Sequence, residues 1–256
     1  RAALNHIQPD RVPVDLGSAT NSGINAAVLS KLRDYYKLEK RDILVTDAFQ
    51  MLGQVDHDLV DRIGGDVVGV SLPHNKFGVK NSDFKDFTMF DGTKVKMPGG
   101  MKFSTDDKGN LYTYPQGDDT VAPSAMMPKN GFYFDLLFRQ QEWDDDDLDG
   151  RRDFAGSFGI FSDELLRHVE EKSKFLYNNT QYSLNGEFGQ ANYGNLSCLP
   201  GPSEKETPGI RNIDEWYMAH MIYKDYITDI FSLQMEVCLK NLELYHQAVG
   251  DRIDVI

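Results

Sequence analysis

The first part of the chain alternates between apolar runs and amphipathic stretches. Residues 11–17 have the composition of a strand, and apolar residues with helical spacing follow over 24–35. A second helix is predicted over 56–63, ended by Gly64, before the apolar run 66–72. A run without polar alternation is typical of a strand covered on both faces, although a buried helix segment has the same pattern. The order favours strand–helix units and a parallel sheet.

The middle of the chain, residues 77–150, follows a different pattern of short alternating stretches separated by turn residues. Asp91-Gly92, the Pro-Gly-Gly at 98–100 and the polar stretch 106–110 predict hairpin turns. We therefore predict an antiparallel meander inserted after the second parallel strand, as a lid or subdomain. Its expected strands are 88–90, 94–97, 101–104 and 111–114.

Helical spacing returns in the last part of the chain. Ser162 is the expected N-cap of a helix that runs to about residue 177. Residues 181–188 predict a third parallel strand, and the Gly-, Pro- and Asn-rich stretch 189–209 predicts a long, mobile loop. A helical region over about 212–249, broken near 226–229, precedes a fourth strand signal at 252–256.

These signals predict four parallel strands, beginning near residues 12, 67, 182 and 253. A complete (β/α)8 barrel takes about 200 to 250 residues, more than remain outside the predicted insertion. We therefore predict an α/β fold that is the first half of a TIM barrel, with the antiparallel meander inserted. The expected parts are 1–76 (the first two β/α units), 77–150 (the inserted hairpin subdomain) and 151–256 (the third unit and the start of the fourth strand).

A half-barrel leaves a strand edge and one side of its core open, so we expect the chain to be part of a longer protein. A second copy of the chain, in a homodimer, is another candidate to cover the edge. Forty acidic against 27 basic residues oppose binding of nucleic acid, which is driven by Lys and Arg. The apolar runs are far shorter than the roughly 20 residues of a membrane span. We expect a cytoplasmic protein, and Cys198 and Cys238 fit a reducing compartment.

Five segments occur in a recognisable order over almost the whole chain. They are 10–17 (Asp-Arg-Val-Pro-Val-Asp-Leu-Gly), 66–70 (Asp-Val-Val-Gly-Val), 91–100 (Asp-Gly-Thr-Lys-Val-Lys-Met-Pro-Gly-Gly), 127–135 (Met-Pro-Lys-Asn-Gly-Phe-Tyr-Phe-Asp) and 245–254 (Tyr-His-Gln-Ala-Val-Gly-Asp-Arg-Ile-Asp). In this order they resemble the N-terminal half of the uroporphyrinogen decarboxylase-like superfamily, especially its corrinoid-dependent methyltransferase branch. That family has a (β/α)8 barrel fold.

The resemblance implies a methyltransferase that moves a methyl group between a small methylated compound or thiol and a corrinoid protein. In the zinc-dependent members the His and Cys ligands lie in the later half, so zinc would be held by residues beyond Ile256 and no ligand is predicted in this chain. Residues 70–74 read Val-Ser-Leu-Pro-His where the decarboxylases have an acidic Phe-Ser-Asp-like segment. The missing acidic residue speaks against decarboxylation, so a decarboxylase of porphyrinogen or another carboxylated compound is kept as the alternative. A non-catalytic ligand- or partner-binding subunit is a further alternative.

Ligand-facing groups of a barrel lie at the C-terminal ends of its parallel strands. Glu187 and His74 are the predicted catalytic residues for a small-molecule substrate, Glu187 as an acid/base group or ligand carboxylate and His74 as a general base or metal ligand. The competing interpretations are a salt-bridge or capping role for Glu187 and an ordinary loop histidine at His74. The predicted substrate-binding residues are Asp15, Ser18, Asn21, Ser22, Asn75 and Asn185.

Overall fold

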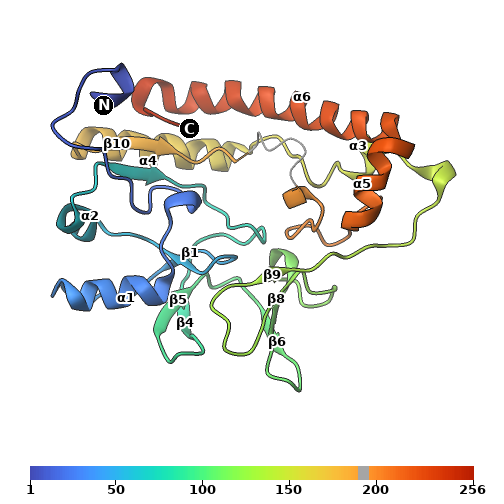
Figure 1. Ribbon diagram of the computed structural model, residues 1–256, viewed down its shortest axis with the longest axis horizontal. Coiled ribbons are helices and arrows are strands. Elements are labelled where there is room, and N and C mark those ends of the chain that lie inside the picture. Colours follow the sequence, from blue (N-terminus) through green and yellow to red (C-terminus); the bar gives the residue numbers. More distant parts are fainter. Residues whose placement is uncertain (190–195) are drawn as a thin grey trace.

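The computed structural model describes residues 1–189 and 196–256. Figure 1 shows the long helices α4 and α6 beside a short parallel strand pair, with α1 and small antiparallel sheets on the other side. The helices are α1 (Ala26–Tyr35), α2 (His57–Ile63), α3 (Gly150–Asp153), α4 (Asp163–Asn179), α5 (Ile213–Ile222) and α6 (Lys224–Val249). The strands are β1 (Val45–Asp47), β2 (Leu52–Gly53), β3 (Val67–Val70), β4 (Lys85–Thr88), β5 (Lys94–Met97), β6 (Phe103–Thr105), β7 (Leu111–Thr113), β8 (Ala125–Met127), β9 (Asp135–Leu136) and β10 (Ser183–Gly186).

Local signals set the ends of the main helices as predicted. The Ser162 hydroxyl accepts the Leu165 N–H at the start of α4, and Gly64 ends α2 with a left-handed φ of 82°. The predicted helical region near the C-terminus is confirmed as α5 and α6. Its break lies at Tyr223, earlier than predicted, where φ is −116° and ψ is 56°.

The predicted half of a (β/α)8 TIM barrel with four parallel strands is wrong. The parallel sheet in the described residues has two strands, β3 and β10, paired from Val67 with Ser183 to Val70 with Gly186. The two outer segments contribute single parallel bridges, Asp15 to Val67 and Val255 to Asn185. In the first of them Pro13 has no N–H to donate, and its neighbour Val12 is 80% exposed. The last segment begins as a 3-10 helix over Gly250–Arg252, which shortens its extended part.

The antiparallel region forms two separate sheets in place of the one predicted meander. Strands β4 and β5 form a hairpin around the predicted turn at Gly92, while β6, β7, β8 and β9 pair in chain order. The Pro-Gly-Gly segment at 98–100 separates the two sheets instead of joining paired strands. Strands β8 and β9, and the hairpin of β1 with β2, were not predicted from the sequence.

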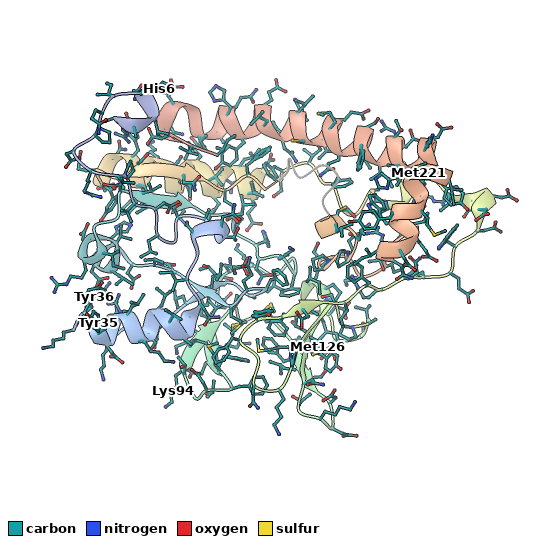
Figure 2. All side chains as sticks on the ribbon, viewed as in Figure 1. His6, Tyr35, Tyr36, Lys94, Met126 and Met221 are labelled. Atoms are coloured by element: carbon teal, nitrogen blue, oxygen red, sulfur yellow. The ribbon has the colours of Figure 1, made fainter. Side chains whose placement is uncertain are left out.

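The core consists of three apolar clusters. The first lies around α1 and the antiparallel sheets, the second packs β3 and β10 against α4 and α6, and the third joins α3, α5 and the start of α6. Large apolar side chains also remain on the surface, among them Tyr35 at the end of α1 and Met221 on α5 (Figure 2). No helix within 1–189 or 196–256 is long and apolar enough to cross a membrane.

Candidate functional site

A cavity of about 390 Å³ lies where β3 and β10 end. Its walls come from the loop 17–23, the β1–β2 hairpin, the segment 71–76 after β3, and Glu187 after β10. A second cavity of about 240 Å³ adjoins it and reaches Lys172 on α4. The two cavities share Gly17, Ser18, Thr46, Gly53 and Ser71. The ends of the parallel strands therefore do border a concave site, although no barrel surrounds it.

Glu187, a predicted catalytic residue, lines the larger cavity. Its Oε2 accepts the backbone N–H of Leu72 at 3.2 Å, which joins the end of β10 to the segment after β3. Burial raises the pKa of Glu187, and the Asp47 carboxyl raises this pKa further. The Leu72 N–H and the Lys172 ammonium oppose these two effects without cancelling them. The carboxyl is thus biased toward its protonated form.

Helix α4 adds two basic side chains to the same place. The Nζ of Lys172 donates to the Ser71 hydroxyl at 2.6 Å, and the Nε2 of His168, one turn earlier, lies 3.2 Å from the Ser71 carbonyl oxygen. Burial lowers the pKa of Lys172, while nearby Glu187 raises it. Burial and the Lys172 charge lower the pKa of His168. Both bases are biased toward their neutral forms.

A second acid and a second base, Asp47 and Lys76, also line the larger cavity. Burial raises the pKa of Asp47 at the end of β1, although its carboxylate accepts the Gln50 N–H at 2.7 Å. Burial lowers the pKa of Lys76, whose Nζ lies 4.5 Å from the centroid of the Phe49 ring. Lys76 and Asp47 partly compensate each other. The two adjoining cavities therefore bring together two carboxyls and two amines with shifted pKa values, a pattern typical of functional sites.

The structure brings three predicted binding residues into one hydrogen-bonded group. The Ser18 hydroxyl donates to the Asp15 carboxylate at 2.6 Å and accepts from the Asn185 amide at 2.9 Å. This group ties the segment before α1 to β10. Ser18 lines both cavities, so it is the member placed to contact a ligand.

The other predicted residues occupy less direct positions. Asn75 lines the larger cavity, but its Oδ1 accepts two backbone N–H groups, those of Phe77 and Val79, and so shapes the turn after β3. His74 is exposed at the rim of that cavity. Asn21 and Ser22 lie in the 3-10 helix Thr20–Ser22 and are not among the residues that line the two cavities.

One missed residue had a detectable signal in the sequence. Lys172 lies between Val169 and Leu176 on the apolar face of α4, a position where a charge is unexpected. Asp47 and Lys76 had no such signal, because only the packing of the β1–β2 hairpin against the segment after β3 brings them to the cavity. The site residues missed from the sequence are Asp47, Ser71, Lys76, His168 and Lys172.

Neither a metal-binding cluster nor a match to a known protein assigns a function to this site. Within the part of the chain that the structure describes, no group of three or more His, Cys, Asp or Glu side chains could hold a metal ion. The zinc implied by the family resemblance therefore has no ligand set in that part of the chain. No protein-family model, no curated protein and no solved structure matches this chain. Its function has to be inferred from the site itself.

Proposed function

We propose that the larger cavity binds a small methylated compound and that the protein transfers its methyl group to a thiol or a corrinoid protein. The resemblance of the five sequence segments to the methyltransferase branch suggests the reaction class. The observation that carries the proposal is the Glu187 carboxyl, which lines the cavity with its pKa raised by burial. We assign Glu187 the role of general acid.

Methyl transfer from nitrogen or oxygen requires a proton at the atom that loses the methyl group. The acceptor attacks the methyl carbon, and the electron pair of the broken bond stays on the heteroatom. A protonated Glu187 donates its proton to that pair, which avoids a strongly basic leaving group. The N–H of Leu72, at 3.2 Å from Oε2, orients the carboxyl for this transfer.

The polar lining of the cavity favours a ligand that has a hydrogen-bond donor. The Oδ1 atom of Asn81 is buried without a hydrogen-bond partner, and Asn81 lines the larger cavity. A buried acceptor left unpaired is costly, so a ligand N–H or O–H that reached it would bind favourably. A volume of about 390 Å³ suits a small molecule. A methylated amine satisfies both conditions.

A carboxy-lyase acting on a small acid is the second candidate. Lys76 lines the larger cavity and Lys172 the smaller one, and each could hold a substrate carboxylate there. The volume of the larger cavity favours a small carboxylic acid over a tetrapyrrole. Both candidates use Glu187 to move a proton, but they differ in the bond that breaks.

A single-turnover experiment separates these possibilities. The purified chain is mixed with methylamine and free reduced cobalamin, and methylcobalamin formation is followed by absorbance. We expect Glu187→Gln to slow the transfer by about 100-fold while methylamine binding, measured by calorimetry, persists. Glu170→Gln, an exposed carboxylate on α4, is the matched control and should react like the unaltered protein.

The proposal fails if neither methylamine nor dimethylamine yields methylcobalamin, or if Glu187→Gln reacts as fast as the unaltered protein. Release of CO2 from a small keto acid, lost in Glu187→Gln, would establish the carboxy-lyase instead. Binding of these compounds without turnover of either kind would establish a non-catalytic ligand-binding subunit.

A further inference from the structure

We infer that Lys172 is a nucleophile that forms an imine with a small ketone or aldehyde bound in the smaller cavity. Lys172 lines that cavity, and within the described residues its Nζ makes one hydrogen bond, to the neutral Ser71 hydroxyl at 2.6 Å. No carboxylate in residues 1–189 or 196–256 forms an ion pair with it. The amine is therefore held in position without being neutralised by an anion.

The cavity around Lys172 fits a compound of a few carbon atoms. Its volume is about 240 Å³, and Val55, Val60 and Leu176 provide an apolar wall. Ser18, shared with the larger cavity, and Gln54 provide polar groups for hydroxyl substituents. Because α4 is a regular helix of 17 residues packed against β3 and β10, the amine is fixed by a rigid element and not by a loop.

The chemistry requires a neutral amine and a proton carrier. The Lys172 lone pair attacks the carbonyl carbon, the carbonyl oxygen takes up a proton, and the resulting carbinolamine loses water as the C=N bond forms. The net reaction joins amine and carbonyl with release of one water, and no oxidant or reductant is consumed. Burial already lowers the pKa of Lys172, which increases the neutral fraction, and Glu187 is the nearby acid that can protonate the departing hydroxyl.

The titratable groups that influence Lys172 come from two elements. Glu187, after β10, favours the ammonium form, whereas burial disfavours it more strongly. His168 lies one turn away on α4, and its Nε2 forms a hydrogen bond with the backbone carbonyl oxygen of the same residue, Ser71. Neither neighbour forms an ion pair with the amine in the described part of the chain, so its lone pair can reach a carbonyl carbon.

Reductive trapping tests the inference on the unaltered protein. The chain is treated briefly with acetone and borohydride at pH 7, and each lysine is quantified by peptide mass spectrometry. Lys174, exposed on the same helix, is the internal reference. We expect isopropyl labelling of Lys172 to be at least about tenfold faster than that of Lys174 and to saturate with acetone concentration, because a ketone bound in the cavity meets the amine at a high effective concentration.

Equal labelling rates for Lys172 and Lys174, or a Lys172 rate that rises linearly without saturation, would overturn the inference. Lys172→Arg retains the positive charge but cannot form the imine, so its fast labelling phase should disappear while the slow surface labelling remains. The trapping needs neither a methyl donor nor an acceptor, so its outcome is independent of the methyl-transfer experiment.

Discussion

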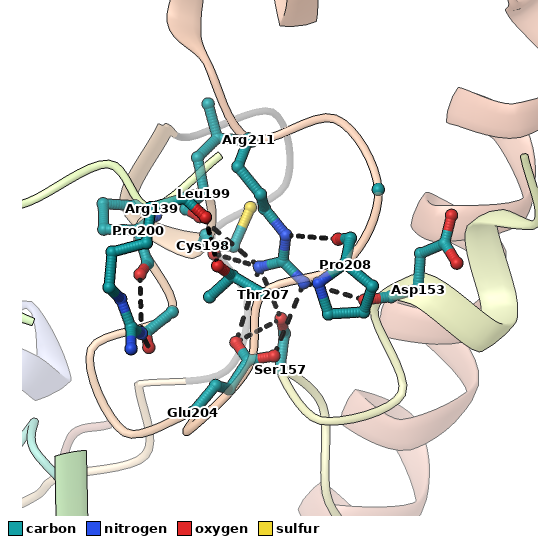
Figure 3. Close-up of polar contacts among 12 residues, drawn as sticks. Arg139, Asp153, Ser157, Cys198, Leu199, Pro200, Glu204, Thr207, Pro208 and Arg211 are labelled. Carbon is teal, nitrogen blue, oxygen red and sulfur yellow. Dashed lines mark hydrogen bonds and ion pairs between the residues drawn. The ribbon is translucent and has the colours of Figure 1, made fainter. Parts of the chain in front are cut away.

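Two regions of this protein hold a positive charge away from water, and they differ in the hydrogen-bond and ion-pair partners that they give it. Arg211, whose polar contacts are drawn in Figure 3, is 0% exposed, and its guanidinium lies 3.9 Å from the centroid of the Phe154 ring. It donates to the Pro208 carbonyl at 2.9 Å and to the Asp153 carbonyl at 2.7 Å, and it forms an ion pair with Glu204 at 3.4 Å. Almost the whole donor capacity of the guanidinium is used within the protein.

Lys172 has a much poorer set of partners. Its ammonium has three N–H donors, but it makes a single hydrogen bond to the part of the chain that the structure describes, the one to Ser71. The nearby Glu187 carboxyl is itself biased toward its neutral form. A cavity of about 240 Å³ borders this side chain, whereas backbone carbonyls enclose Arg211.

This difference in hydrogen-bond partners distinguishes structural from functional buried charges. A buried charge whose donors are satisfied by the protein holds the fold together, and a ligand can offer it nothing more. A charge with spare donors beside a cavity is destabilising until a ligand or a chemical step uses it. Arg211 belongs to the first kind, because it ties the segment 198–209 to α3, and Lys172 belongs to the second.

The largest expected effect is the loss of stability on replacing Arg211. Arg211→Met leaves the Glu204 carboxylate, 8% exposed, without its cation and several carbonyl oxygens without donors. We expect the free energy of unfolding, measured by urea titration, to fall by about 3 to 5 kcal/mol. A loss below about 1 kcal/mol is what an exposed ion pair would give, and it would contradict the structural role assigned to Arg211.

Lys172→Met should change stability in the opposite direction. The substitution removes a partly buried charge that has one neutral partner and replaces it with an apolar chain of similar length. We expect the free energy of unfolding to rise by about 1 kcal/mol in the same urea assay. Lys174→Met, on the exposed face of α4, is the control and should leave the midpoint unchanged. A clear loss of stability in Lys172→Met would show that this charge is structural after all.

The raised pKa of Glu187 predicts a specific pH dependence. The folded state binds the proton of this carboxyl more tightly than the unfolded state does. The protonated carboxyl therefore stabilises the folded state at low pH, and this contribution is lost as the pH rises through the raised pKa. The stability of the unaltered protein relative to Glu187→Gln should therefore fall as the pH rises above about 4.3, the usual pKa of a glutamate side chain. Urea midpoints of both proteins, taken from about pH 4 to about pH 8, measure the difference. A difference that is flat, or that grows with pH, would contradict the assignment.

The smallest effect is expected at an exposed ion pair. Arg151 and Glu236 form a two-bonded pair between α3 and α6, but their side chains are 43% and 62% exposed. Because water and salt screen such a pair, Glu236→Gln should leave the urea midpoint unchanged within measurement error, at low and at high salt. A large loss would mean that the number of partners, and not burial, decides the contribution of a charge.

Much of the local structure could be predicted because its signals lie close together in the sequence. The Ser162 cap, the Gly64 stop and the Asp91-Gly92 turn each depend on a few neighbouring residues, and all three are present in the structure. Glu187 and Ser18 were likewise found from their positions after strand signals. The barrel prediction failed because sheet extent depends on pairing between distant segments, and the bridges at Asp15 and Val255 stop after one residue each.

The main helices, the hairpin turns and the polar residues that follow the two parallel strands can all be located from short stretches of the sequence. The folded chain is what brings Lys172 of α4, Asp47 of β1 and Lys76 after β3 to the paired cavities beside Glu187. The physical reason is range: caps and turns act over a few residues, whereas burial and charge, which shift the pKa values of these four side chains, depend on segments distant in the chain.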